Sequence, residues 1–247
     1  MLSQKNFILL NKAIYFPKQK ILAISDLHLG YDKMLKNQGI TFPFNQLEHT
    51  KKEVQDIINE LKTNNFQINK IVINGDLKHH FQFERGELFD IRNFLNFLEG
   101  FVKRENIIII KGNHEKFELD SKKQKPFHIE SDIGFTHGDK LFPEILDKKI
   151  KTIVLGHVHP AITLKDKQKV KKEKYKAFFI GKWKRKNIII LPSFFPFIEG
   201  TSFDVSDHEY NYFDKFFIIP KTTIKKFNAF ILGKDKIYEF GKLNNIN

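Results

Sequence analysis

The stretch Asn106-Ile107-Ile108-Ile109-Ile110-Lys111-Gly112-Asn113-His114-Glu115 decides the fold of this chain. Its four consecutive isoleucines are too few for a helix and are all β-branched, so they predict a short strand that is buried on both faces. A glycine and three residues that can bind a metal ion or transfer a proton follow the strand. Because open α/β sheets bind ligands beyond the carboxyl ends of parallel strands, this stretch predicts functional side chains at a sheet edge.

Four further apolar runs end in polar motifs of the same kind. They are Ile21–Ile24 before Ser25-Asp26-Leu27-His28, Ile71–Ile73 before Asn74-Gly75-Asp76, Ile133–Thr136 before His137-Gly138-Asp139, and Thr152–Leu155 before Gly156-His157-Val158-His159. Residues i and i+2 of an extended chain point to the same side, so Asp26 and His28 should reach one common point, as should His157 and His159. One shared sheet would bring all of these side chains into a single crevice.

The other segments complete an α/β pattern. Apolar periodicity predicts helices over Gln46–Lys62 and about Glu87–Phe101, a loop over Met34–Pro43, and a loop or short helix over 116–128. Short apolar runs predict an opening hairpin and late strands, which are Phe7–Leu10, Ala13–Phe16, Asn187–Leu191, Phe216–Ile219, Phe227–Leu232 and Ile237–Phe240. Neither a repeat nor a linker divides the chain, so we predict one domain over residues 1–247, with a basic β-hairpin at about 161–190.

Composition excludes several classes of protein. The absence of cysteine excludes disulfides and thiolate metal sites and fits a reducing compartment. The first residues, Met1–Phe7, lack the pattern of a signal peptide, and no apolar stretch approaches the ~20 residues of a membrane span. We expect a soluble cytoplasmic protein that does not associate with membranes.

The formal net charge of +13 suggests a nucleic-acid partner, but lysine accounts for nearly all of it. Only four of the 42 basic residues are arginine, a skew that AT-rich coding also produces. Position is therefore more informative than the total. Between Ala161 and Lys186 the chain has 11 basic and 2 acidic residues, so most of the excess charge lies in one segment.

The polar residues at the strand ends predict a metal centre. A single histidine or aspartate in such a place more often makes a structural hydrogen bond or caps a turn. That explanation weakens when eight such residues follow buried runs, namely Asp26, His28, Asp76, Asn113, His114, His137, His157 and His159. Carboxylate, amide and imidazole ligands without thiolate suit Mn²⁺, with Fe²⁺ or Zn²⁺ as alternatives. Seven ligands exceed the needs of one ion, so we expect two ions ~3.5–4 Å apart that share a carboxylate.

The order of these motifs, from Asp-x-His through Gly-Asp, Gly-Asn-His-Glu and a single His to Gly-His-x-His, resembles the calcineurin-like metallophosphoesterase superfamily. The stretches Ser25–Tyr31, 75–79 and Leu191–Phe194 resemble its archaeal SbcD-related branch, close to the ligase-associated PdeM phosphoesterases. The resemblance implies an α/β (α+β) fold, a four-layer α/β/β/α sandwich with a central β-sandwich.

The resemblance also implies roles for single residues. Asp26, His28 and His159 would hold the first metal ion, Asp76 would bridge, and Asn113, His137 and His157 would hold the second. His114 would stay unligated and face the substrate. Glu115 would support His114 from behind, at a position where many members have aspartate. His79 is a candidate for substrate contact, with a solvated loop residue as the alternative.

These roles imply hydrolysis of phosphodiester bonds by a hydroxide that bridges the two ions, with His114 assisting the leaving group. The basic segment and the branch resemblance favour a DNA nuclease that acts on single strands or ends, with DNA repair as its process. The alternatives are a small-molecule nucleotide phosphodiesterase or phosphatase and a non-catalytic scaffold. A homodimer is compatible with the sequence, and protein partners cannot be read from it.

The basic segment offers candidates for DNA contact. Lys171, Lys172 and Lys174 could follow a phosphate backbone. The aromatic residues interleaved with them could stack on unpaired bases; they are Tyr175, Phe178, Phe179 and Trp183. The alternative is a solvated hairpin whose aromatic residues face the core, because alternation alone does not say which face is wet.

Overall fold

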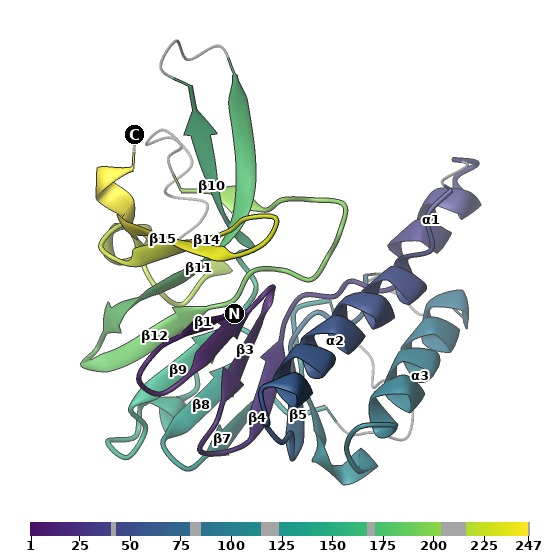
Figure 1. Cartoon of the computed structure of the whole chain (residues 1–247), viewed down its shortest axis with the longest axis horizontal. Coiled ribbons are helices and arrows are strands. Elements are labelled where there is room, and N and C mark those ends of the chain that lie inside the picture. Colours follow the sequence, from purple (N-terminus) through teal and green to yellow (C-terminus); the bar gives the residue numbers. More distant parts are fainter. Residues whose placement is uncertain (41–42, 80–84, 115–123, 167–170, 204–215, 247) are drawn as a thin grey trace.

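The computed structural model contains two β-sheets packed face to face, with helices on the outer face of the first sheet (Figure 1). The structure describes residues 1–40, 43–79, 85–114, 124–166, 171–203 and 216–246. A hairpin rises from the second sheet, and the site described below lies at one edge of both sheets.

The first sheet has the strand order β1-β2-β3-β4-β5-β6. Its strands are β1 Leu2–Ser3, β2 Ile8–Leu10, β3 Ala13–Phe16, β4 Ile21–Ile24, β5 Lys70–Asn74 and β6 Ile107–Ile110. Strands β4, β5 and β6 are parallel, and Ile24 pairs with Ile73 while Asn74 pairs with Ile110. Their carboxyl ends are therefore adjacent, which places the three following loops side by side.

The second sheet has the order β13-β10-β11-β12-β9-β8-β7, and β14 and β15 are added beside β11. Its strands are β7 Phe127–Glu130, β8 Ile133–Thr136, β9 Thr152–Leu155, β10 Pro160–Lys165, β11 Lys172–Trp183, β12 Lys186–Ile190, β13 Thr201–Ser202, β14 Asn228–Leu232 and β15 Ile237–Lys242. Strands β8, β9 and β12 are parallel, so their carboxyl ends also meet at one edge.

Two long helices cover the first sheet (Figure 1). They are α2 Gln46–Thr63, which Asn45 caps by accepting a hydrogen bond from Glu48 N, and α3 Arg85–Glu99. The shorter helical elements are α1 Tyr31–Asn37, α5 Lys221–Ile224, η1 Arg104–Asn106, η2 Pro143–Leu146 and η4 Leu243–Asn245. In the described residues the fourth layer consists of short elements, including η2 and α5, that cover the second sheet. The layered α/β fold is confirmed, and none of the described helices has the length and apolarity to cross a membrane.

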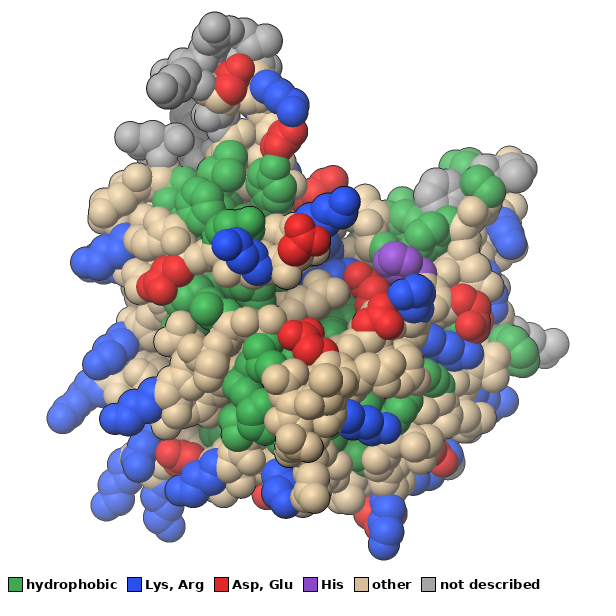
Figure 2. Space-filling model, viewed as in Figure 1, with side chains coloured by type: hydrophobic (Ala, Val, Ile, Leu, Met, Phe, Trp, Pro, Cys, Tyr) green, Lys and Arg blue, Asp and Glu red, His purple; other side chains and the backbone are tan. Residues whose placement is uncertain are grey.

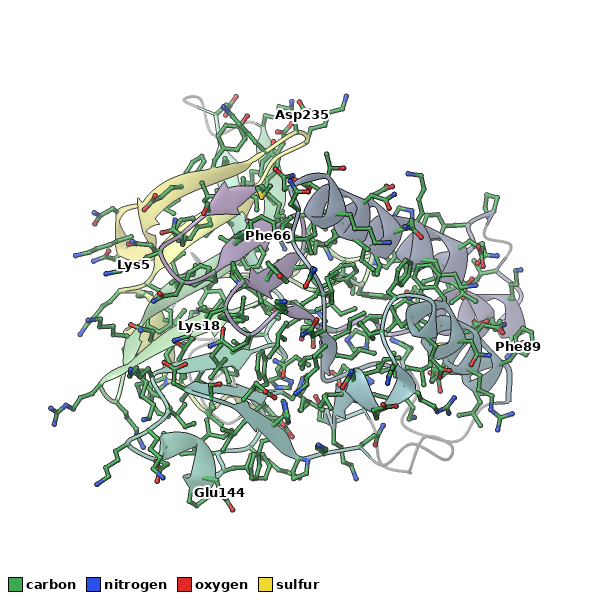
Figure 3. All side chains as sticks on the ribbon, turned by 60° about the horizontal axis from the view of Figure 1, so that its bottom comes forward. Lys5, Lys18, Phe66, Phe89, Glu144 and Asp235 are labelled. Carbon is green, nitrogen blue, oxygen red and sulfur yellow. The ribbon has the colours of Figure 1, made fainter. Side chains whose placement is uncertain are left out.

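The isoleucine run of β6 is buried on both faces, as its composition predicts. Ile107 and Ile109 pack with the helices, and Ile108 and Ile110 pack between the two sheets. Side chains fill the space between the layers (Figure 3). Phe66 packs against the helix-side core, while Phe89 projects from α3 and is 63% exposed. The strand that carries Asn113 and His114 is thus held firmly from both sides.

Three local predictions were wrong or incomplete. Residues 34–37 of the predicted loop belong to helix α1 instead, because Tyr31 N donates to Gln46 Oε1 and Lys33 pairs with Asp90, contacts far away in sequence. Phe216–Ile219 is not a strand, and Phe217 and Ile219 are buried against the second sheet without joining it. Phe127–Glu130 is a strand, while most of the Lys-rich loop predicted before it lies outside the described residues.

Candidate metal centre

The candidate site lies where the carboxyl ends of the two sheets meet. Loops after β4, β5 and β6 bring one set of polar side chains, and loops after β8 and β9 bring the three histidines. The prediction that one shared sheet brings these side chains together was therefore wrong, although the side chains do meet in one crevice. Asn74 joins the two sheets, because its side-chain amide donates to Thr136 O at 2.9 Å and to Val154 O at 3.3 Å.

Five of the predicted ligands have left-handed backbone. The φ angles are 54° at Asp26, 47° at His28, 42° at Asp76, 72° at His157 and 44° at His159. Residues other than glycine adopt this conformation rarely, and its cost of about 1–3 kcal/mol must be offset by surrounding contacts. The expectation of an extended chain at Asp-x-His and His-x-His was thus wrong. Tight turns, and not strand alternation, aim these side chains inward.

One group of possible ligands consists of Asp26, His28 and His159. The Nε2 atoms of His28 and His159 are 3.2 Å apart, and His159 Nε2 is 3.5 Å from Asp26 Oδ1. The Asp26 carboxylate also accepts hydrogen bonds from His157 N at 3.1 and 3.2 Å. Ser25 Oγ lies 2.7 Å from Asp26 Oδ2 and fixes the carboxylate from behind.

A second group surrounds Nε2 of His137. Asn113 Oδ1 and His157 Nδ1 each lie 3.0 Å from this atom, and Asp76 Oδ2 lies 3.3 Å from it. On the other side of the ring, Nδ1 faces Asn74 O at 3.4 Å. A proton on Nε2 can be donated to one neighbour only, whereas a cation near these atoms would satisfy all of them.

Asp76 is shared between the groups. Its Oδ2 lies 3.3 Å from His137 Nε2, 3.8 Å from His28 Nε2 and 3.9 Å from His114 Nε2. Its Oδ1 accepts a hydrogen bond from His114 N at 3.1 Å. The position between both groups suits the bridging role that the family resemblance implies.

The charges in this crevice call for a cation. Burial raises the pKa of Asp26, but His159 and His137 together lower it to about 2. Burial also raises the pKa of Asp76, yet the surrounding histidines, His137 foremost, hold it well below its usual range. Burial lowers the pKa of His137, yet the two carboxylates raise it to about 10. Burial also lowers the pKa values of His28 and His157, which favours the neutral form that binds metals. The two buried carboxylates thus favour a positive charge beside them, which a divalent cation could supply in place of a proton on His137, and the donor set fits such cations.

Two glycines let the sheets approach this closely. A Cβ at Gly75 would lie 2.0 Å from His137 Nδ1, and a Cβ at Gly156 would lie 2.0 Å from Ser25 Oγ. Gly75 also has a φ of 90°, which disfavours any other residue. The glycines of the Gly-Asp and Gly-His motifs are therefore needed because one sheet's loop presses against the other's.

The backbone of His79 orients His114. His114 Nδ1 lies 2.5 Å from His79 O and donates to it, which leaves Nε2 on the side of Asp76. The N–H of His79 donates to the buried Glu87 carboxylate at 2.7 Å. The imidazole of His79 lies among the rings of His28, His114 and Tyr31. A substrate contact of that ring stays a prediction, and Glu115 lies outside the described residues.

The basic segment divides into two separate groups. The 12 residues of β11 span about 36 Å at ~3.3 Å per residue. The group Lys182, Lys184 and Arg185 lies at the β11–β12 turn, at the amino end of β12 and thus opposite the crevice. Lys171, Lys172 and Lys174 lie on the β10–β11 hairpin, which begins directly after His159. Only the hairpin group therefore lies on the side of the crevice.

The three candidate lysines of the hairpin differ in their contacts. Lys174 Nζ donates to Gly200 O at 3.2 Å, and Thr201 N donates to His159 O at 2.8 Å, so Lys174 reaches the rim of the crevice. Lys171 pairs with Glu173 at 2.6 Å in solvent. Lys172 is exposed. Lys174 is therefore the best placed of the three.

The aromatic residues of β11 do not form a base-stacking surface. Phe178 and Phe179 are fully buried, and Tyr175 and Trp183 pack against the core of the second sheet. The alternative of aromatic residues facing the core was correct for this segment. The ammonium of Lys176 is buried and donates to Ser193 O at 2.8 Å and to Phe195 O, and burial lowers its pKa to about 7.

Sequence reasoning missed the residues that hold the site from outside. Ser193 Oγ donates to Asp26 O at 2.9 Å, and Phe195 N donates to the same oxygen at 3.0 Å. The Phe195 ring lies 5.2 Å from the His28 ring. The signals for this segment were the polar end of the Leu191-Pro192-Ser193 run and the resemblance of Leu191–Phe194 to the family branch, and neither indicated this role.

Comparisons with known proteins agree with this architecture. A family model described as calcineurin-like phosphoesterase matches residues 19–216. The nuclease MPE of Pseudomonas putida is 17% identical with a TM-score of 0.61, covering 95% of this chain and 94% of that chain. Vacuolar protein sorting 29 of Cryptosporidium parvum is 15% identical with a TM-score of 0.37, covering 90% and 97%. A metallophosphoesterase of Sphaerobacter thermophilus is 13% identical with a TM-score of 0.34, covering 71% and 76%. No curated protein matches the sequence.

Proposed function

Because this chain belongs to the calcineurin-like phosphoesterase family, we propose that it cleaves the phosphodiester bonds of DNA, acting on single strands or strand ends. The observation that carries the proposal is the crevice itself. Carboxylate, amide and imidazole groups from five loops converge there, and the basic β10–β11 hairpin starts at its edge.

In this proposal the crevice holds two divalent cations. Asp26, His28 and His159 bind the first, Asn113, His137 and His157 bind the second, and Asp76 binds both. Mn²⁺ is the proposed metal, with Fe²⁺ or Zn²⁺ as alternatives, since the ligands are oxygen and imidazole without thiolate. When bound, the cations would make hydroxide available near neutral pH and neutralise the charge of the phosphate.

His114 is the proposed general acid. Its Nδ1 proton is engaged by His79 O, so the ring can turn only Nε2 toward a substrate. As imidazolium it would donate the Nε2 proton to the leaving oxygen when the P–O bond breaks, which prevents a free alkoxide from leaving. His79, with its ring beside His114, is the proposed neighbour of the leaving group.

The choice of DNA rests on charge near the crevice. Lys172, Lys174 and Lys176 alternate along β11 and therefore lie on one face of that strand. The innermost is half-buried and donates to Phe195 O, the second contacts Gly200, and the outermost is exposed. A row of this kind can follow the phosphates of one strand from the crevice outward.

A single assay tests the proposal. The purified protein with Mn²⁺ is given single-stranded DNA, duplex DNA, RNA and cyclic nucleotides, and rates are measured over a range of salt concentrations. The proposal expects single-stranded DNA to be cleaved fastest. The logarithm of its binding constant K, measured over the same salt range, should fall linearly with the logarithm of the salt concentration. Preference for a cyclic nucleotide with weak salt dependence would instead indicate a small-molecule phosphodiesterase. Inertness toward every substrate, together with no Mn²⁺ binding, would indicate a scaffold.

A further inference from the structure

A group of aromatic rings from separate segments lies beside the candidate metal centre. We propose that Tyr31, Phe44 and Phe197, arranged around Phe195, form a subsite that stacks on an unpaired nucleobase next to the phosphate held in the crevice. The inference rests on the proposed phosphodiesterase function and adds the part of the substrate that the enzyme recognises.

The rings form a continuous series that starts at the metal ligands. The Phe195 ring lies 5.2 Å from His28 and 5.0 Å from Tyr31. The Phe197 ring lies 5.1 Å from Tyr31 and 5.1 Å from Phe44. The first contact of the series is therefore a proposed ligand, and the later ones lead away from it along the surface.

The four rings differ in burial, which distinguishes the ring that supports the group from the rings that could contact a ligand. Phe195 is 2% exposed and fills the floor, whereas Tyr31, Phe44 and Phe197 are only partly buried. Rings that served the core alone would be buried like Phe178 and Phe179. Partly exposed rings next to a phosphate site instead suit a flat aromatic ligand, and every base offers such a face.

Backbone contacts hold the rings at a constant place relative to the crevice. Phe195 N donates to Asp26 O at 3.0 Å, and Tyr31 N donates to the Gln46 side chain at 3.1 Å. The same Gln46 side chain donates to His28 O at 2.8 Å. The subsite and the proposed ligands therefore belong to one hydrogen-bonded unit, so a phosphate bound at the ligands would present its attached nucleoside to the rings.

Charge beside the rings suits the backbone of a strand. Gly200, which accepts from Lys174 Nζ at 3.2 Å, is close in sequence to Phe197 on the same segment. A row of phosphates could follow the lysines of β11 while one base turns toward the rings. Paired bases expose no stacking face, so the ligand class is single-stranded nucleic acid.

The test compares two substrates of equal charge. One is a short thymidine oligonucleotide, and the other is a tetrahydrofuran oligomer of the same length that has the phosphates but lacks bases. With Mn²⁺, the wild-type protein should show a kcat/KM about 5- to 150-fold higher for the thymidine strand. Tyr31→Leu and Phe197→Leu should each reduce this ratio several-fold, and the double variant should bring it close to one.

Conservative and matched variants complete the design. Tyr31→Phe and Phe197→Tyr keep a ring and should keep the ratio, while Phe240→Leu removes an exposed ring from β15 and should change neither rate. Equal wild-type rates on both substrates would overturn the subsite while leaving the phosphodiesterase function intact. Cleavage of neither substrate would overturn the phosphodiesterase function and the subsite with it. A ratio that persists in the double variant would place base recognition elsewhere.

Discussion

The metal crevice and the β10–β11 hairpin both carry dense charge, but they hold it in opposite ways. In the crevice, Asp26, Asp76 and His137 are almost fully buried, and each lies within 3.8 Å of at least two oppositely charged or imidazole partners. On the hairpin, Lys171 and Glu173 form a pair in solvent, where salt screens such interactions and an ion pair contributes little. Charged residues thus form a cooperative unit in the crevice and act one by one on the hairpin.

Surface charge follows the second pattern over much of the molecule (Figure 2). Lysine and arginine side chains project mainly at the periphery of the face in view, and several gather at its lower left. A single change there removes one charge. In the crevice, a single change leaves several buried partners without compensation, so its effect should be far larger.

Asp76→Asn should have the largest effect of any conservative change. Asparagine keeps the shape but removes the charge shared by both ligand groups. We expect kcat/KM for a small chromogenic diester to fall at least about 10³-fold, since even one neutral hydrogen-bond donor in an active site is worth ~10²–10³. Metal content per chain, measured by elemental analysis, should also fall. Asp132→Asn, at a partly exposed carboxylate away from the crevice, is the matched control, and full activity of Asp76→Asn would refute the shared-carboxylate role.

His114→Ala should separate chemistry from metal binding within the crevice. The variant should keep its metal content but lose about 10²–10⁴ in turnover, the usual contribution of a general acid. Elemental analysis and steady-state kinetics on the same preparation check both parts. His128→Ala on β7 controls for loss of an imidazole elsewhere. Loss of metal from the His114 variant would make this residue a ligand instead.

Lys176 lies between the two regions, and its lowered pKa should make the stability of the protein depend on pH. Its pKa is lowered to about 7 by burial and by Lys12, although Glu53, Asp26 and Glu199 oppose this. The unfolded chain holds this proton up to about pH 10.5, so between pH 7 and 10.5 unfolding takes up a proton and stability rises with pH. Below pH 7 both states are protonated and the dependence ends.

The measurement is the free energy of unfolding of wild type minus that of Lys176→Met, taken by denaturant titration across this range. The difference should increase by up to about 1.4 kcal/mol per pH unit. The exposed Lys172→Met should show no such trend. A flat difference for Lys176→Met would mean that this ammonium keeps an ordinary pKa and is not desolvated.

The hairpin lysines should give the smallest effects, and unequal ones. Lys174 reaches the crevice rim, whereas Lys171 is engaged by Glu173. Lys174→Ala should reduce the slope of log K against log salt for single-stranded DNA by about 0.7, the value for one phosphate contact, and Lys171→Ala by less. A small chromogenic diester provides the baseline. Equal slopes for both variants would contradict the prediction that Lys174 contacts a DNA phosphate more strongly than Lys171 does.

Prediction from sequence succeeded where local pattern and function coincide. The isoleucines of β6 are buried on both faces, and the polar residues after β4, β5, β6, β8 and β9 do converge. It failed where long-range contacts decide. Helix α1 depends on Gln46 and Asp90, and Phe178 and Phe179 are both buried because β11 is covered on both faces, by the first sheet on one and by short elements on the other. Neither relation is expressed in neighbouring residues.

By itself, the sequence determined the chemistry available to this protein. The absence of cysteine, the motifs after apolar runs and the lysine-rich segment limit the metal ligands to oxygen and imidazole and concentrate positive charge in one segment. Only the tertiary structure decided that two sheets share the crevice, that five of the seven predicted ligands adopt left-handed backbone, and that β11 carries its lysines to opposite ends. The physical reason is that residue type sets what a side chain can bind, whereas packing across distant segments sets where it lies and what it faces.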